Sequence, residues 1–274
     1  MTMTEPVSAA RAVAAETTQA LAGAFGERLT AVYLLGSLAY GGYAPAVSDI
    51  DVAAVLTDRR PDDPDTVTAT VDALRERTPL HGKLSVFWSS LPALRAGESD
   101  GRFPAIDRVQ LAEHGRLLLG TDVAGRIALV SGPDLLVESA RFALGVLATD
   151  EVIAEFHRPR RLLVDPVWFT KAVLFPVRLL RTAAEGSGRS STNDEAIGWY
   201  LGRPDPAGAG LVRLAARVRA GVPLDPEEAA TELAAGLTPL YRAFLDDHTA
   251  RLPPDLAADF ARWGDRLPVQ PSGN

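Results

Sequence analysis

Two aspartates separated by one residue, Asp49 and Asp51, begin an apolar segment that ends at Leu56. The segment has the pattern of a buried β-strand, and alternate residues of a strand project from the same face. The two carboxylates would then lie side by side, where they repel each other unless a cation lies between them. Mg²⁺ suits such a pair because it binds one or two protein carboxylates together with phosphate oxygens and water. The pair therefore predicts a Mg²⁺ site that also accepts phosphate.

A Gly-Ser loop just upstream supplies the second half of this chemistry. Gly36 allows the backbone to approach a phosphate closely, and Ser37 offers a hydroxyl. The N-terminus of a following helix would offer free N–H groups. A phosphate cradle beside paired carboxylates is typical of phosphoryl or nucleotidyl transfer. An isolated D-x-D is more often a surface turn, but the ordered series of strand, Gly-Ser, Gly41, Ser48, two aspartates and strand favours the functional interpretation.

Short strands and helices must position these residues. Apolar runs predict strands at 30–35, 49–56 and 84–88, and helical spacing predicts helices at 5–25, 66–77 and 106–114. The stretch LLLGTDV, 117–123, is predicted to be a turn. From residue 133 onward only helical segments are predicted, at 134–155, 165–185, 193–201, 208–219, 226–247 and 254–264. We therefore expect an α+β domain over 1–130 and an all-helical domain over 131–270.

Composition narrows the class of protein. The 274 residues carry a formal net charge of −7 and no cysteine, which argues against nucleic-acid binding and excludes disulfides and thiolate metal sites. The first 16 residues lack the pattern of a signal peptide, and no apolar run reaches membrane-spanning length. We expect a cytoplasmic protein without a membrane partner, and the sequence does not distinguish a monomer from a dimer.

The motif G-S-x-x-x-G followed by S-D-I-D resembles the signature of the nucleotidyltransferase superfamily with the DNA polymerase β-like fold. The resemblance implies a mixed sheet with helices, followed by a helical bundle. It also implies that Asp49 and Asp51 hold Mg²⁺ and that Gly36, Ser37 and Ser48 lie at the triphosphate of ATP. Lys171, on a predicted helix, would neutralise phosphate, although it could equally lie on a solvated helix face.

Two later stretches, 102–120 and 178–201, are similar to the aminoglycoside adenylyltransferases that act on streptomycin and spectinomycin. The resemblance implies an adenylyltransferase of the antibiotic-resistance type. It would transfer AMP from ATP to a hydroxyl of a small, cationic, aminoglycoside-like molecule and release pyrophosphate. The helical domain would hold the acceptor.

The chain departs from the family at the third carboxylate, whose position aligns with Ser85. A serine hydroxyl cannot act as a general base near pH 7. Three alternatives arise. Glu113, Asp107 or another acid takes the role, or the acceptor needs no base. Otherwise the chain is a nucleotide-binding regulatory or sensing protein with weak or no transferase activity.

Three residues are candidate acceptor contacts by the same resemblance. Glu113 matches the family in type, His114 replaces a tryptophan that stacks on the antibiotic, and Asp194 matches an aspartate that contacts ammonium groups. Each also has a plain structural interpretation. Glu113 and His114 would be helix-surface residues. Asp194 would lie in the first turn of a helix capped by Thr192 or Asn193.

Overall fold

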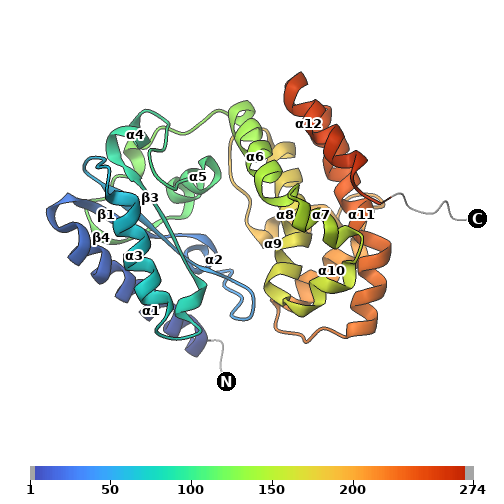
Figure 1. Cartoon of the computed structure of the whole chain (residues 1–274), viewed down its shortest axis with the longest axis horizontal. Coiled ribbons are helices and arrows are strands. Elements are labelled where there is room, and N and C mark those ends of the chain that lie inside the picture. The colour runs from blue at the N-terminus through green and yellow to red at the C-terminus, as the bar shows by residue number, and fades with distance from the viewer. Residues whose placement is uncertain (1–3, 269–274) are drawn as a thin grey trace, which may run out of the picture. The chain divides into compact units, whose positions relative to one another are not determined.

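The computed structural model describes residues 4–268, and the chain divides into two compact units, residues 1–130 and 131–274. Figure 1 shows a sheet flanked by helices in the first unit and helices alone in the second. Within the described residues, no helix has the length and apolar character needed to cross a bilayer.

The first unit is built on a four-stranded mixed sheet with the order β3-β2-β1-β4. Its strands are β1 (Leu29–Leu34), β2 (Ile50–Leu56), β3 (Leu84–Ser90) and β4 (Arg116–Gly120). β1 runs antiparallel to both β2 and β4, whereas β2 and β3 are parallel. Because parallel neighbours need a crossover connection, a helix, α3 (Asp63–Arg75), joins them.

Strict alternation along the strands gives each sheet face its own apolar core. Val52, Ala54 and Leu56 belong to the cluster formed with α1 (Thr4–Phe25) and α3. Ala53, Val55 and Phe87 belong to the cluster on the opposite face, which includes residues of α4 (Leu91–Arg95) and α5 (Ala105–His114). Odd-numbered residues of β2, Asp51 among them, therefore share the α4/α5 face.

The prediction of a turn over 117–123 is wrong for residues 117–120, which form β4. The strand lies at the sheet edge beside β1, and all five of its residues are exposed. An exposed edge strand lacks the alternation of buried and polar residues that identifies a strand in sequence. The helix α4 is also absent from the sequence prediction, because its five residues form a single capped turn with Ser90 as N-cap.

The second unit is helical throughout the part that the structure describes, as predicted. Side chains cap five of its helices at the N-terminus: Ser131, Thr149, Asp165, Thr192 and Asp225. The predicted segment 134–155 is two helices, because Thr149 caps a new one. The helices are α6 (Gly132–Leu147), α7 (Asp150–Phe156), α8 (Pro166–Glu185), α9 (Asn193–Leu201), α10 (Ala209–Arg219), α11 (Pro226–Thr249) and α12 (Pro254–Asp265).

Short 3₁₀ turns complete the path of the chain. They are η1 (Gly26–Arg28), η2 (His81–Lys83), η3 (Ala124–Arg126) and η4 (Pro159–Val164). Of these, η2 lies nearest to the paired aspartates, because it leads directly into β3 beside the start of β2.

Candidate functional site

Asp51 packs directly against the turn that follows β1. Leu35 N donates a hydrogen bond of 2.8 Å to Asp51 O, which joins the end of β1 to the start of β2. Gly36 comes next and has a φ of +60°, in the left-handed region that favours glycine. A Cβ atom built on Gly36 would overlap Asp51 Oδ2 and lie 3.1 Å from Asp51 Cγ. Gly36 is therefore required both by the backbone and by the space that the Asp51 carboxylate takes.

The Gly-Ser loop of the sequence is the first turn of a five-residue helix, α2 (Gly36–Tyr40). Gly36 and Ser37 are buried, and Gly41, with a φ of +98°, ends the helix and donates its N–H to Ser37 O at 3.1 Å. The Ser48 hydroxyl accepts a hydrogen bond of 3.0 Å from Ala44 N. Ser48 thus closes the loop that leads from α2 to the aspartates.

Asp49 lies one residue before β2, so the predicted strand starts one residue too early. Its charge acts on two neighbours, Lys83 and Tyr43. Burial lowers the pKa of Lys83, and Asp49 partly offsets that effect. Burial and then Asp49 raise the pKa of Tyr43, whose buried hydroxyl has no hydrogen-bond partner within residues 4–268. Lys83 Nζ donates to Pro45 O at 2.5 Å and to Ala46 O at 3.1 Å, which ties the loop to η2.

Ser85 lies directly beside Asp51 in the parallel ladder of β2 and β3. Residues paired in this way project from the same face, so the alignment of Ser85 with a carboxylate position agrees with its place in the sheet. Arg102 occupies the space next to it: NH1 lies 3.3 Å from Ser85 Oγ, and NH1 donates to Val86 O at 2.8 Å. Its guanidinium carbon lies 4.7 Å from the centre of the Phe87 ring.

Sequence reasoning did not find Arg102 or Lys83. Arg102 reaches Ser85 because Arg102 pairs with Trp88 of β3, whose backbone N donates to Arg102 O at 2.9 Å. An isolated bridge of this kind leaves no periodic pattern in the sequence. Lys83 carried a detectable signal, since it lies two residues before Ser85 at the start of a predicted strand.

Glu113 and His114 lie at the end of α5, which packs against α2. The His114 and Tyr40 rings meet edge to face, with centroids 5.7 Å apart. His114 Nε2 lies 4.0 Å from Glu113 Oε2, and the Glu113 side chain is 16% exposed. α5 therefore places His114 against Tyr40, the last residue of α2, with Glu113 beside His114.

The donor set fits a hard divalent cation held jointly with a ligand. Asp49 and Asp51 are both half-buried, and the space against the Asp51 carboxylate is kept open by Gly36. Within residues 4–268, no cluster of three or more His, Asp or Glu side chains is placed to hold a metal ion. Two carboxylates plus phosphate oxygens and water are the ligands that Mg²⁺ commonly takes, whereas a complete protein cage is typical of Ca²⁺.

Known structures share this architecture. The crystal structure of spectinomycin adenyltransferase AAD(9) from Enterococcus faecialis with ATP and spectinomycin matches with a TM-score of 0.54. The match covers 79% of this chain and 95% of that chain at 12% sequence identity. The chain has the nucleotidyltransferase fold. At this identity the likeness shows the fold alone, and it confirms the fold predicted from the G-S and S-D-I-D motifs. No protein-family model matches the chain, and no curated protein matches it.

The remaining predicted residues of this nucleotidyltransferase fold belong to the second unit. Asp194 is 71% exposed and lies 3.7 Å from Arg219 in an ion pair. It is not the helix cap: Thr192 caps α9 and forms a capping box with Glu195. Lys171 lies half-buried in α8, between the buried Thr170 and Ala172. In the first unit the structure joins Gly36 to Asp51 by packing and Asp51 to Ser85 by strand register, whereas Lys171 and Asp194 lie on two separate helices of the second unit.

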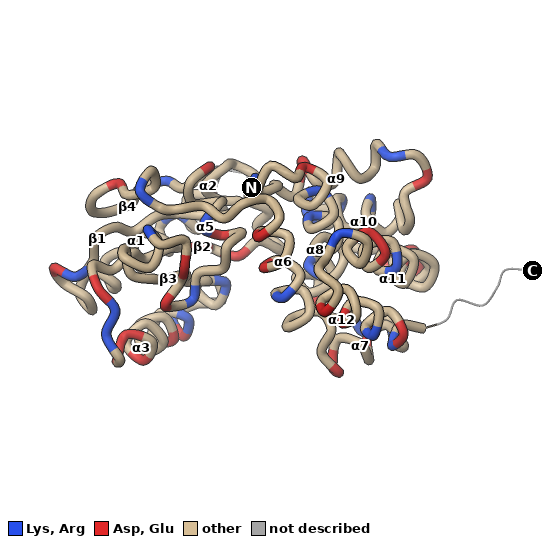
Figure 2. The backbone as a smooth tube through the Cα atoms, turned by 90° about the horizontal axis from the view of Figure 1, so that it is seen from above, with Lys and Arg blue, Asp and Glu red and all other residues tan. Residues whose placement is uncertain are grey.

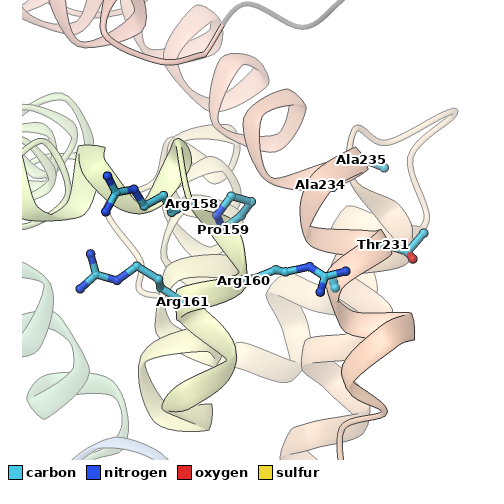
Figure 3. Close-up of a pocket in the computed structure, with 8 residues that line it drawn as sticks. Arg158, Pro159, Arg160, Arg161, Thr231, Ala234 and Ala235 are labelled. Carbon is cyan, nitrogen blue, oxygen red and sulfur yellow. The ribbon is translucent and has the colours of Figure 1, made fainter.

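Three basic side chains of the second unit lie close together in the chain, in η4 and just before it. Arg158, Arg160 and Arg161 line a pocket beside α11. Figure 3 shows Arg160 extending toward α11, while Arg158 and Arg161 extend the other way. Arg160 lies 3.6 Å from Glu227 in an exposed ion pair. Figure 2 shows basic and acidic positions interspersed in both units rather than collected into a basic stripe.

Proposed function

We propose that the chain transfers AMP from ATP to a hydroxyl of a small molecule. One observation carries the proposal: the Asp51 carboxylate packs against a left-handed glycine at the first turn of a helix, at one end of a parallel strand pair. This arrangement places carboxylate oxygens beside backbone that a phosphate can approach. The known structure with this fold was solved with ATP and spectinomycin, which supports the same substrate classes here.

In this proposal Asp49 and Asp51 hold Mg²⁺, which when bound neutralises charge on the phosphates. Gly36 and Ser37 bind the β- and γ-phosphates, and Ser48 keeps the loop in shape. The acceptor oxygen forms a bond to the α-phosphorus as the bond to the pyrophosphate oxygen breaks. Glu113 accepts the proton of the acceptor hydroxyl, and pyrophosphate leaves with the electron pair.

The proposed acceptor is a cationic, aminoglycoside-like molecule, and the protein would then act in the cytoplasm as an antibiotic-resistance enzyme. The net charge of −7 and the half-buried Glu113 support a cationic acceptor. His114 would pack against the acceptor, and Asp194 would bind one of its ammonium groups. Lys171 is proposed as a further contact of the phosphates.

Pyrophosphate release from Mg-ATP across a panel of aminoglycosides and spectinomycin tests the proposal. Release with one acceptor, abolished in Asp49→Ala/Asp51→Ala, would support it. ATP binding by calorimetry is measured in parallel on the same samples. The transfer reaction would be contradicted if the wild type binds ATP, the double variant does not, and the wild type releases no pyrophosphate with any acceptor.

A second candidate function is supported by Ser85, which takes the sheet position beside Asp51 without offering a base. In that case the chain binds a nucleotide for regulation or sensing. The two functions differ in the fate of the nucleotide: a sensor returns ATP unchanged after prolonged incubation with every acceptor, whereas a transferase yields an adenylylated product detectable by mass spectrometry.

A further inference from the structure

The Arg102 guanidinium is fixed over β3 by three neighbours. NH1 lies 3.3 Å from Ser85 Oγ and donates to Val86 O at 2.8 Å, and NH2 lies 3.4 Å from Ser85 Oγ. The flat guanidinium lies over the Phe87 ring, with its carbon 4.7 Å from the ring centre. These contacts hold an otherwise exposed side chain in one place.

This place is on the same sheet face as the aspartates. Ser85 pairs with Asp51 in the parallel register, and Phe87 belongs to the apolar cluster of the α4/α5 face. The strand order puts β1 on one side of β2 and β3 on the other. Asp51 is therefore flanked by the Gly36 turn on the β1 side and by the Arg102 guanidinium on the β3 side.

The guanidinium keeps donors for a ligand. NH1 uses its two N–H groups on Ser85 and Val86, and NH2 uses one on Ser85. The second N–H of NH2 and that of Nε have no hydrogen-bond partner among residues 4–268, and Arg102 forms no ion pair with a carboxylate in that range. Two neighbouring N–H groups of one guanidinium match the geometry of a phosphate or carboxylate.

We propose that Arg102 binds a phosphate oxygen of the nucleotide, at the α-phosphoryl group, from the β3 side of Asp51. The proposal rests on the proposed function. The Gly36 turn serves the β- and γ-phosphates on the β1 side, so the α-phosphoryl group is the oxyanion that reaches the other flank. A cationic acceptor is repelled by a guanidinium, which leaves the nucleotide as the group that Arg102 meets. Arg102 thus supplies positive charge beside Ser85, the residue that aligns with a family carboxylate.

A non-hydrolysable nucleotide tests this without any acceptor. The dissociation constants of Mg²⁺ with α,β-methylene-ATP, and of adenosine, are measured by calorimetry for the wild type, Arg102→Met and Arg59→Met. Arg59 is a matched control: its guanidinium also lies over a β3 ring, 5.1 Å from the centre of Trp88, and its Nε donates to Asp100 O at 2.9 Å. Trp88 belongs to the opposite face of the sheet.

Arg102→Met is expected to weaken binding of Mg-α,β-methylene-ATP by about tenfold or more, because a hydrogen bond to a charged group is lost. Adenosine, which has no phosphate, and the Arg59→Met variant should show no change. Arg102→Lys should fall between, since an ammonium keeps the charge but not the paired donors. If Arg102→Met fails to fold, the affinity of Arg102→Lys for the nucleotide analogue tests the proposal in its place.

Two results would overturn the proposal in distinguishable ways. Equal affinities of wild type, Arg102→Met and Arg59→Met for the nucleotide analogue would refute the role of Arg102 and leave the proposed function standing. Absence of binding to the wild type, when circular dichroism shows a folded chain, would refute both. A tenfold loss that is equally large for adenosine would mean that Arg102 shapes the site and does not bind phosphate.

Discussion

The predicted polar residues of the two units differ in how the fold places them. In the first unit, Gly36, Asp51, Ser85 and Arg102 come from four separate segments and are joined by packing, strand register and hydrogen bonds. In the second unit, Asp194 lies in an exposed ion pair on α9. The first unit brings a left-handed glycine and a carboxylate together at one end of its sheet, whereas Thr192 and Asp194 in the second unit lie at the start of a helix.

This difference teaches where a single sequence is informative. Neighbouring carboxylates at the start of a buried strand signal chemistry, because like charges repel and folding alone does not explain them. Residues that obey a local rule, such as Thr192 at the start of α9, are explained without function. Substitutions in both units can distinguish residues that serve function from residues that serve local structure.

Acid should destabilise the chain through the second unit. His248 is 1% exposed, and burial lowers its pKa to about 4 from an ordinary 6.5. Below pH 6.5 the unfolded chain gains a proton that the folded chain refuses until about pH 4. The free energy of unfolding should therefore fall over this window, by about 3 kcal/mol in total. Urea unfolding at pH 7 and pH 4.5 measures the loss.

His248→Phe should remove this acid sensitivity, since phenylalanine fits among the neighbouring Phe244 and Phe260 rings and takes no proton. His81→Gln is the control in the first unit, where the imidazole already has Thr78 and Glu16 as hydrogen-bond partners. If the pH dependence of stability is unchanged in His248→Phe, or is lost in His81→Gln, the acid response does not come from His248, and the prediction is wrong.

Gly36→Ala should lower the transfer rate by about 10²-fold, because the new Cβ displaces the Asp51 carboxylate and small misplacements in a site have effects of that size. Gly41→Ala is the matched control. Gly41 also has a positive φ, +98°, but no atom lies within 4 Å of a Cβ built there. Both variants should lose about 1–2 kcal/mol of stability from the backbone conformation. If Gly36→Ala and Gly41→Ala have equal transfer rates, glycine is needed at position 36 for its backbone conformation and not for the space that the Asp51 carboxylate takes.

Ser85→Glu distinguishes the two flanks of Asp51. A carboxylate at this position would pair with Arg102 and stand beside the aspartates, so nucleotide affinity should fall by about tenfold. Ser85→Ala, which removes only the hydroxyl, should change the affinity much less. A rise in the transfer rate in Ser85→Glu would mean that the site lacks a base, which is one of the alternatives that the sequence leaves open. Calorimetry and pyrophosphate release on the same samples give both readouts.

Asp194→Asn should have the smallest effect, a rise in KM for a cationic acceptor of about two- to fivefold with kcat unchanged, as expected for an exposed charge. Thr192→Ala is the control, because it removes the helix cap and should lower stability by about 1 kcal/mol without a change in KM. If the two variants have the same KM, Asp194 does not bind the acceptor and has only a structural place at the start of α9.

The sequence predicts the part of the fold that rests on periodicity. The buried strands β1, β2 and β3 are recognisable from continuous apolar runs, and the long helices from their spacing and caps. β4 is not, because an exposed edge strand is defined by its pairing with β1, which the sequence does not display. The same reason applies to Arg102, which reaches Ser85 across 17 residues through one bridge at the edge of β3. Side chains that arrive through tertiary pairing alone lie beyond what local patterns encode.

Gly36 also has a meaning in genetic terms. Every amino acid that a codon change could introduce at this position carries a Cβ atom, and any Cβ there overlaps the Asp51 carboxylate oxygen. Only synonymous changes in the Gly36 codon therefore leave the protein unaffected. Gly41, four positions after Ser37, has open space around it, and a methyl group there costs backbone strain alone. A library of natural or random variants should therefore show Gly36 depleted of missense changes far more strongly than Gly41.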